Sequence, residues 1–176
     1  MGEVLVRPAR TVDVRAIREL VDTYSRDGRL LSKATVTLFE DIQEFLIAEI
    51  DGEVVGCGAL HVMWEDLAEV RTVAVAPDRA RHGIGSALLT ALMERAREVG
   101  VQRVFCLTFM VRFFQAHGFV EIGETPVDHD VYQQMLQSYD EGVAEFLGLE
   151  RVKPNTLGNH HVVQGVVQGT QVGVDL

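Results

Sequence analysis

Residues 69–89, EVRTVAVAPDRARHGIGSALL, decide how this chain is expected to fold. The segment begins with the apolar run Val70–Val75, which predicts a buried strand that stops before Pro77. A basic loop follows and leads through Gly83 and Gly85 into residues with the periodicity of a helix. Because a helix begun by glycines exposes its first amide N–H groups and the positive end of its dipole, the segment predicts an anion site between strand and helix.

The glycine turn can be compared with three phosphate-binding motifs. A P-loop requires a lysine directly after its last glycine, and Gly85 has none. A dinucleotide fingerprint requires a small residue where this chain has Leu88, and a tight turn directly after the strand. Residues 80–85 resemble motif A of the GNAT acetyltransferases, Gln/Arg-x-x-Gly-x-Gly/Ala, with the departure that Ala80 occupies the Gln/Arg position. A glycine-rich turn that binds no ligand is the remaining alternative.

The resemblance to GNAT acetyltransferases implies a binding site for acetyl-coenzyme A (acetyl-CoA). Backbone amides at the glycine turn would bind the pyrophosphate, basic side chains would add positive charge, and the strand would hold the pantetheine arm by β-type pairing. A backbone N–H of Val73 or Val75 would donate to the acetyl carbonyl. The implied cofactor-binding residues are Val73, Ala74, Val75, Arg79, Arg81, His82, Gly83, Ile84, Gly85, Ser86 and Phe114.

Phe114 occupies a position where many GNAT enzymes have a tyrosine that protonates the departing thiolate. Phenylalanine has no acidic proton, so this acid is absent from the chain. A reference thiol pKa of about 8.5 makes a CoA thiolate a tolerable leaving group near neutral pH. The reaction is therefore expected to proceed without that tyrosine.

The composition limits the partners of the protein. Among 176 residues, 16 Lys plus Arg stand against 26 Asp plus Glu, and the net charge of −10 argues against nucleic acid or an anionic membrane as a partner. No apolar run has the length of a membrane span and the first residues lack the apolar core of a signal peptide, so a cytoplasmic protein is expected. Neither Cys57 and Cys106 nor the six histidines show metal-ligand spacing, so reduced cysteines and no metal are expected.

Apolar periodicity predicts a mixed order of elements along the chain. The expected strands are 4–7, 45–50, 54–63, 69–75, 103–108 and 119–122, and the expected helices run from Thr11 or Asp13 to Gly28, for a short stretch after Ser32, and over 83–99, 111–117 and 132–136. Asp51–Gly52 is typical of a two-residue hairpin, and residues 143–149 are ambiguous. The strand connections are hairpins early in the chain and crossovers later, which predicts an α/β fold with a mixed parallel and antiparallel sheet. This is the order of the GNAT fold, whose sheet splays after its fourth strand.

The resemblance extends from Val4 to Asn159, so residues 1–159 are expected to form one acetyltransferase domain. Residues 160–176 are rich in glycine and show no periodicity. They are expected to form a peripheral or mobile C-terminal tail.

Several runs also resemble the acetyltransferase unit of N-acetylglutamate synthases, in particular their short actinobacterial form. These runs are 30–33, 56–60, 69–77, 107–119, 139–147 and 153–155. The resemblance implies acetyl transfer from acetyl-CoA to the α-amino group of L-glutamate, the first step of arginine biosynthesis. L-glutamine stays open as a second acceptor, and family habit suggests a homodimer.

The same resemblance assigns roles at the substrate site. Glu69 matches the carboxylate that acts as general base, which a protonated amine requires before it can attack a thioester. Arg71 alternates in phase with Glu69, so both side chains leave the same face of the strand. The expected substrate-binding residues are Lys33, Arg71, Thr108 and Lys153, with Arg112 as an alternative to Lys153. A solvated strand end at Glu69 and solvated surface cations are the competing explanations.

Two other functions are compatible with the sequence. A GNAT enzyme that acetylates another small-molecule or protein amine would have the same fold and cofactor, but no use for two cations beside the base. A non-catalytic acetyl-CoA sensor would have no use for Glu69. His61 lies in the middle of a strand and is expected to be a satisfied core or slot residue rather than a catalyst.

Overall fold

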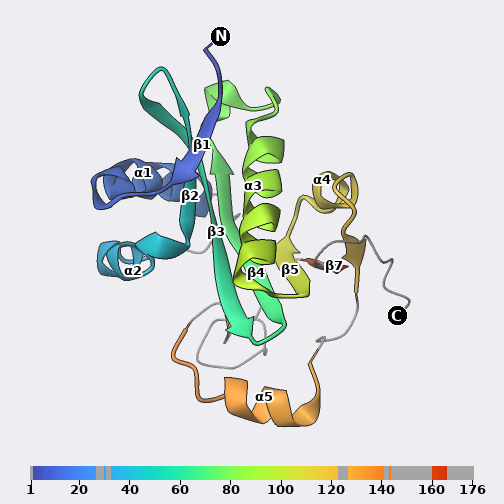
Figure 1. The fold of residues 1–176 in the computed structure, drawn as a ribbon. Coiled ribbons are helices and arrows are strands. Elements are labelled where there is room, and N and C mark those ends of the chain that lie inside the picture. Colours follow the sequence, from blue (N-terminus) through green and yellow to red (C-terminus); the bar gives the residue numbers. More distant parts are fainter. Residues whose placement is uncertain are drawn as a thin grey trace.

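The structure is a computed structural model that describes residues 2–26, 30, 33–122, 127–140 and 143, and the backbone of residues 160–165. Its centre is a seven-stranded sheet with the order β1-β2-β3-β4-β5-β7-β6 (Figure 1). Neighbouring strands are antiparallel except β4 and β5, which are parallel, and this mixed sheet confirms the predicted fold class. The strands are β1 (Leu5–Pro8), β2 (Phe45–Ile50), β3 (Glu53–Trp64), β4 (Leu67–Val75), β5 (Arg103–Thr108), β6 (Val120–Glu121) and β7 (His160–Gly165).

Helices cover both faces of the sheet. α1 (Val14–Ser25) packs on one face through Ile17 and Val21, and α3 (Ile84–Val99) packs on the other through Leu89 and Leu92. The remaining helices are α2 (Thr35–Glu40), α4 (Val111–Gln115) and α5 (His129–Met135), with short 3-10 turns η1 (Thr11–Asp13), η2 (Ile42–Glu44) and η3 (Pro77–Arg79). Figure 1 shows α5 beyond the end of the sheet where β3 turns into β4.

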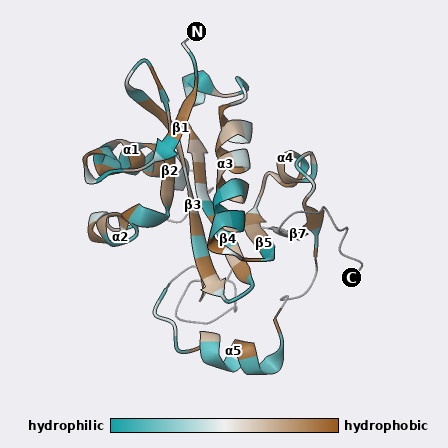
Figure 2. Ribbon diagram, viewed as in Figure 1, coloured by the Kyte–Doolittle hydropathy of each residue, from teal (hydrophilic) through white to brown (hydrophobic). Residues whose placement is uncertain are grey.

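β3 shows how closely the two helix layers approach the sheet. Cys57 and Ala59 point toward α1, whereas the alternate positions Gly58 and Leu60 point toward α3. A Cβ atom at Gly58 would lie 2.9 Å from Leu92 Cδ1, so glycine lets α3 pack directly against the strand. Figure 2 shows hydrophobic residues along the central strands and a mixture of hydrophobic and hydrophilic residues on the helices. The core therefore lies in two layers, one on each side of β3 and β4.

β4 and β5 separate shortly after they begin. Their parallel pairing ends where Glu69 lies opposite Phe105, although β4 continues to Val75 and β5 to Thr108. β4 also contains a β-bulge at Thr72, whose φ is 59°. The second half of β4 therefore has no strand partner on the β5 side, as the predicted splay requires.

Most predicted element boundaries agree with the structure to within a few residues. Asp51 and Gly52 have φ values of 51° and 84°, the left-handed pair that a tight hairpin turn requires. Gly83 and Gly100 are left-handed at the two ends of α3. The predicted end of the first helix at Gly28, the Ser32 start of the second, and residues 144–149 lie outside the described residues.

The prediction of a C-terminal tail is wrong for residues 160–165. These residues form β7, which lies between β5 and β6 and pairs with both in antiparallel register. Glycines at the end of a short run suggested irregular structure, but backbone pairing on both sides stabilises the segment as a strand. Residues 166–176 lie outside the described residues.

Candidate active site

The glycine turn between β4 and α3 has the backbone geometry of an anion site. Gly83 is the residue before α3, with φ of 79°, and no side chain caps the helix there. The first helical hydrogen bond from the turn joins Ala87 N to Gly83 O at 3.0 Å. The amides of Ile84, Gly85 and Ser86 therefore have no acceptor within the helix and can donate to a phosphate.

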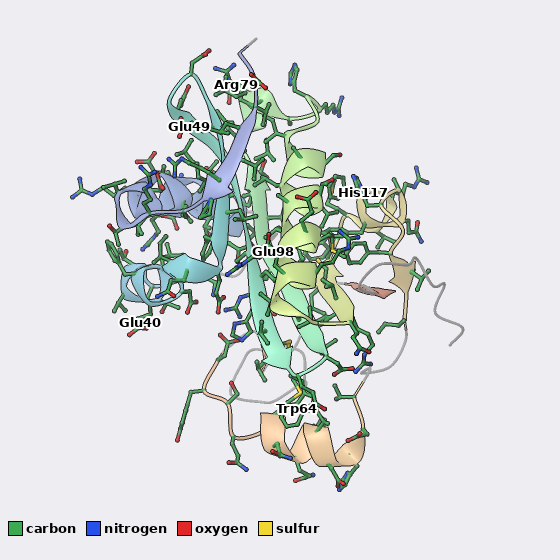
Figure 3. All side chains as sticks on the ribbon, viewed as in Figure 1. Glu40, Glu49, Trp64, Arg79, Glu98 and His117 are labelled. Atoms are coloured by element: carbon green, nitrogen blue, oxygen red, sulfur yellow. The ribbon has the colours of Figure 1, made fainter. Side chains whose placement is uncertain are left out.

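The basic residues of the turn differ in how they are held. Arg79, labelled in Figure 3, lies 3.8 Å from Glu53 Oε2 and 3.4 Å from Asp78 Oδ2, so protein carboxylates already engage its guanidinium. Arg81 and His82 are exposed. Two of the three predicted cations therefore face solvent beside the free amides.

The end of β4 faces the side from which β5 has diverged. Ala76 N donates to Val55 O on β3 at 2.8 Å. Because the hydrogen-bonding groups of successive strand residues alternate between the two sides of the strand, the N–H and C=O of Val75 point away from β3. The Tyr24 hydroxyl of α1 donates to Val75 O at 2.5 Å. The side chains of Val73 and Val75 pack toward α3, and Ala74 packs toward α1. Because the peptide of Val75 points away from β3, its N–H is placed to pair with an extended ligand in the splay.

α4 brings aromatic rings close to the glycine turn. Phe114 is buried and packs edge-to-face against Phe119, so it belongs to the hydrophobic core. Its neighbour Phe113 lies closer to the turn, since a Cβ atom at Gly85 would be 3.5 Å from Phe113 Cζ. Sequence reasoning missed Phe113, because a helix of five residues gives no periodicity that separates the core side from the turn side.

Glu69 lies at the point where β4 and β5 part. It is 4% exposed, and its neighbour across the antiparallel ladder is His61 of β3. Its Oε2 lies 4.0 Å from Arg71 Nη1. A buried carboxylate beside a cation, at the start of the splay, has the position that the base prediction requires.

Arg71 is surrounded by carboxylates. It is 8% exposed, and it donates from Nη1 to Asp140 Oδ1 at 2.9 Å and from Nη2 to Glu44 Oε2 at 3.0 Å. Asp41 Oδ2 lies 3.5 Å from the same Nη2. Burial alone would lower the pKa of Arg71, but the charges of Glu69, Asp140 and Glu44 together raise it. The Arg71 guanidinium is therefore permanently charged and links three separate segments of the chain.

Asp140 follows α5 and brings that segment to the sheet. Burial would raise the pKa of Asp140, but the Arg71 charge and a hydrogen bond from Val143 N lower it below the ordinary value. Met135 and Val143 pack with Leu67 in a small core beneath it. Trp64, labelled in Figure 3 next to α5, joins the same cluster.

His61 and Lys33 complete this group of charged side chains. His61 Nδ1 lies 2.7 Å from Glu44 Oε1, so one of its two ring nitrogens has a hydrogen-bond partner, in partial agreement with the prediction of a satisfied residue. Lys33 Nζ lies 3.6 Å from Asp41 Oδ2. We call this group the acidic cluster; its members are Lys33, Asp41, Glu44, His61, Glu69, Arg71 and Asp140.

The other predicted substrate-binding residues are Thr108, Lys153 and its alternative Arg112. Thr108 is buried at the end of β5, where its hydroxyl accepts a hydrogen bond from Met110 N at 2.8 Å. Lys153 lies outside the described residues, and Arg112 is exposed on α4. The roles of Thr108 and Lys153 in substrate binding stay predictions.

Sequence reasoning missed Asp41, Glu44 and Asp140. They come from the junction of α2 and η2, from η2 itself and from the segment after α5, and no spacing in the sequence relates them to Glu69. Cys57 and Cys106 are free and buried, as predicted for reduced core residues. Burial raises the pKa of Cys57 to about 12 and that of Cys106 well above its ordinary value. Neither thiol is a nucleophile near neutral pH.

Within the described part of the chain, no group of three or more His, Cys, Asp or Glu side chains is arranged to hold a metal ion. No helix there is long and apolar enough to cross a membrane.

Comparison with known proteins gives consistent matches. Residues 14–119 match the model of the acetyltransferase (GNAT) family. An amino-acid acetyltransferase of Mycobacterium tuberculosis is 56% identical over 163 residues, which are 90% of this chain and 92% of that protein.

Two solved structures have similar folds. Rv2747 of M. tuberculosis, in complex with CoA, has a TM-score of 0.89 and is 54% identical. The match covers 93% of this chain and 99% of the Rv2747 chain. The N-acetylglutamate synthase of Neisseria gonorrhoeae, complexed with coenzyme A and N-acetyl-glutamate, has a TM-score of 0.76 at 25% identity, over 96% of this chain and 36% of its own.

Proposed function

The chain belongs to the GNAT acetyltransferase family, and on that basis we propose that it transfers acetyl from acetyl-CoA to the α-amino group of L-glutamate. The observation that carries the proposal is the position of Glu69, a buried carboxylate at the start of the splay, with the phosphate-binding amides at the far end of the same strand. The likeness to an amino-acid acetyltransferase and to a synthase complexed with N-acetyl-glutamate supports an amino acid as acceptor.

The residues of the glycine turn fit acetyl-CoA. The three amides of Ile84, Gly85 and Ser86 have no helical acceptor, and a Cβ atom at Gly83 would meet nothing within 4 Å, so a diphosphate can approach the backbone. When bound, acetyl-CoA supplies the thioester carbonyl that the amine attacks. Arg81 and His82 would add positive charge at the pyrophosphate, in a protein whose net charge is −10.

Glu69 prepares the nucleophile. A free α-amine is mostly protonated near neutral pH, so its proton must be removed before the lone pair can attack. Glu69 takes that proton, and a backbone N–H of Val73 or Val75 donates to the carbonyl oxygen as it becomes an oxyanion. Phe114 offers no acid for the departing thiolate, which leaves as an anion and takes a proton from water.

Two cations of the acidic cluster are placed to bind the carboxylates of glutamate. Lys33 contacts Asp41 only at 3.6 Å, and Arg71 Nε has no hydrogen-bond partner among the described residues. Lys33 can donate a charge-assisted hydrogen bond to a substrate carboxylate, and the buried Arg71 guanidinium adds positive charge beside it. The four carboxylates around them favour the ammonium end of the amino acid, so the acidic cluster suits a zwitterionic acceptor.

The charge balance also supports a second candidate acceptor. Four carboxylates (Asp41, Glu44, Glu69 and Asp140) outnumber Lys33 and Arg71, which would favour a polyamine or a peptide N-terminus over a dicarboxylic amino acid. The two acceptors are distinguished by assay.

The test is a thiol-release assay with acetyl-CoA and, one at a time, the standard amino acids, spermidine and a short peptide. We expect glutamate to be acetylated faster than the polyamine or the peptide, with glutamine as the nearest competitor. If spermidine or the peptide reacts faster than every amino acid, the proposed acceptor is wrong although the chain remains an acetyltransferase.

We propose that the reaction takes place in the cytoplasm, because both cysteines are free and buried, which fits a reducing compartment. A homodimer stays a prediction, and the mass of the purified protein measured by light scattering after size-exclusion chromatography would test it.

A further inference from the structure

His61 lies opposite the proposed base on the neighbouring strand. In the antiparallel ladder His61 of β3 pairs with Glu69 of β4, and two positions along Ala59 pairs with Arg71. Directly opposed residues point to the same face of a sheet, with Cβ atoms about 4.5–5.5 Å apart. The His61 imidazole therefore lies on the same face as Glu69, the face that carries the acidic cluster, and its ring nitrogens lie within 4 Å of Glu44 and Asp140.

Glu44 determines which nitrogen of His61 carries the proton. The Glu44 carboxylate can only accept hydrogen bonds, and its Oε1 lies 2.7 Å from His61 Nδ1, so Nδ1 is the protonated nitrogen. Glu44 is itself held through Oε2 by Arg71 Nη2 at 3.0 Å. The remaining nitrogen, Nε2, has a lone pair and lies 3.9 Å from Asp140 Oδ1.

We propose that His61 is a proton-relay residue that acts through Glu69. It accepts on Nε2 the proton that Glu69 has removed from the acceptor ammonium, and it releases this proton to water beside Asp140. One proton moves at each step: ammonium to Glu69, Glu69 to Nε2 through a bridging water, and Nε2 to bulk water, which restores the starting tautomer. The inference rests on the proposed function, since it assigns a route for the proton of that reaction.

Burial explains why the base requires a relay. Glu69 is 4% exposed, so a proton on its carboxyl has little direct contact with bulk water. The side chains that hold His61 are more accessible, at 25% for Glu44 and 21% for Asp140. An imidazole nitrogen with a lone pair can accept a proton and then donate it, so the His61 ring can pass a proton on.

His61 is surrounded by charged side chains of both signs. The negative groups that face it are Glu44 of η2, Glu69 of β4 and Asp140 after α5, and Arg71 of β4 opposes them. Glu44 and Asp140 are each paired with Arg71, so the imidazolium would complete a ring of alternating charge rather than leave an isolated one.

A purely structural role makes a different prediction for the His61→Gln variant. Glutamine can still donate a hydrogen bond to Glu44 but carries no proton between water and Glu69. If His61 only braces Glu44, the variant is nearly as active as the parent at every pH. If His61 relays protons, kcat falls about ten- to a hundredfold near neutral pH, the lower range for loss of a proton-transfer group. The deficit then shrinks as pH rises, because hydroxide takes the proton and more of the amine is already neutral.

The kinetic experiment measures kcat against pH for the parent, His61→Gln and the matched control His129→Gln, with the amino acid that the parent acetylates fastest. His129 is exposed at the start of α5, so its variant should follow the parent. The KM for acetyl-CoA should stay unchanged in all three. A His61→Gln deficit that is absent, or that is constant with pH, overturns the relay.

A measurement without substrate tests the geometry separately. Nitrogen-15 NMR of the histidine rings in the ligand-free protein should show His61 as the Nδ1–H tautomer, and Glu44→Gln should disturb it while leaving His129 unchanged. A His61 protonated on Nε2 contradicts the relay whatever the acceptor is. The parent's rates with amino acids decide the proposed function on their own, so the two failures are distinguishable.

Discussion

The two ends of β4 build their parts of the candidate active site in different ways. At its C-terminal end, consecutive residues from Ala76 to Ser86 form the proposed anion site almost entirely from backbone amides and one left-handed glycine. Near its start, Glu69 and Arg71 meet side chains from β3, η2 and the segment after α5. The first site is local and made of main chain, and the second is non-local and made of charged side chains. Sequence motifs reveal the first kind of site far better than the second.

The largest expected effect breaks the backbone site. Gly83→Glu places a carboxylate beside the three amides that would bind the pyrophosphate, so we predict that acetyl-CoA binding is lost, a drop in affinity of about a hundredfold or more. Isothermal titration calorimetry of the purified variant measures it.

Gly52→Glu is the matched control for this variant. Gly52 has φ of 84° and Gly83 has φ of 79°, and a Cβ atom at either would meet nothing within 4 Å. The strain of a left-handed glutamate is thus similar, but Gly52 lies in the β2–β3 turn. Equal losses of affinity in the two variants would mean that strain, and not the phosphate site, causes the effect.

The second prediction separates the two ends of β4. Glu69→Gln should keep acetyl-CoA affinity but lower kcat by roughly a hundredfold, the usual scale for loss of a positioned base. The deficit should shrink as pH rises, because more of the acceptor amine is then neutral. Glu94→Gln, which alters an exposed carboxylate of α3, serves as the control. If Glu69→Gln turned over as fast as the parent near neutral pH, Glu69 would not be the general base.

The third prediction concerns the cations of the acidic cluster. Lys33→Ala and Arg71→Ala should each raise the KM for glutamate about ten- to a hundredfold, the loss expected for a charge-assisted hydrogen bond, with little change in the KM for acetyl-CoA. Arg71→Lys should recover only part of this, because the guanidinium reaches Glu44 and Asp140 from two different nitrogens.

Glutamine sharpens the comparison of these two cations, since it keeps the α-carboxylate and has a neutral side chain. The variant that harms glutamate more than glutamine identifies the partner of the γ-carboxylate. Arg95→Ala is the control, because Arg95 is exposed and pairs only with Glu98 in the described structure. A KM for glutamate that is unchanged in both variants would exclude these cations as substrate ligands.

The smallest effect is on stability. Asp140→Asn should lower the free energy of unfolding by about 1–2 kcal/mol near neutral pH, because it weakens the hydrogen bond to Arg71. The folded-state pKa of Asp140 is lowered, so its contribution is present above the pKa of the unfolded chain and is lost as pH falls through the folded value. Urea unfolding of parent and variant should therefore differ at neutral pH and converge in acid. A difference that persists in acid would contradict this account.

The fold and the glycine turn before α3 could be predicted from the sequence, whereas anion binding at that turn stays a prediction. Hydrophobic periodicity located α3 and the central strands, and the glycines at positions 52, 83 and 100 located the turns, because only local chemistry sets these features. It failed at His160–Gly165, where pairing with β5 and β6 rather than composition forms the strand.

The acidic cluster could be predicted only in part. The alternation of β4 placed Glu69 and Arg71 on one face, and the resemblance added Lys33. Nothing local relates Glu44 or Asp140 to Arg71, since they are 27 and 69 residues away in sequence and meet it through tertiary packing. The sequence therefore suggested Arg71 as a substrate ligand but gave no sign that protein carboxylates already bind its guanidinium.

The most direct test of the central claim is a competition experiment. The parent protein is mixed with acetyl-CoA and equal concentrations of glutamate, glutamine, spermidine and a short peptide, and the acetylated products are identified by mass spectrometry at early times. We expect amino acids acetylated on the α-amino group to dominate, with N-acetylglutamate among them, and Glu69→Gln to suppress every product. Acetylated spermidine or peptide as the main product, or undiminished product from Glu69→Gln, would contradict it.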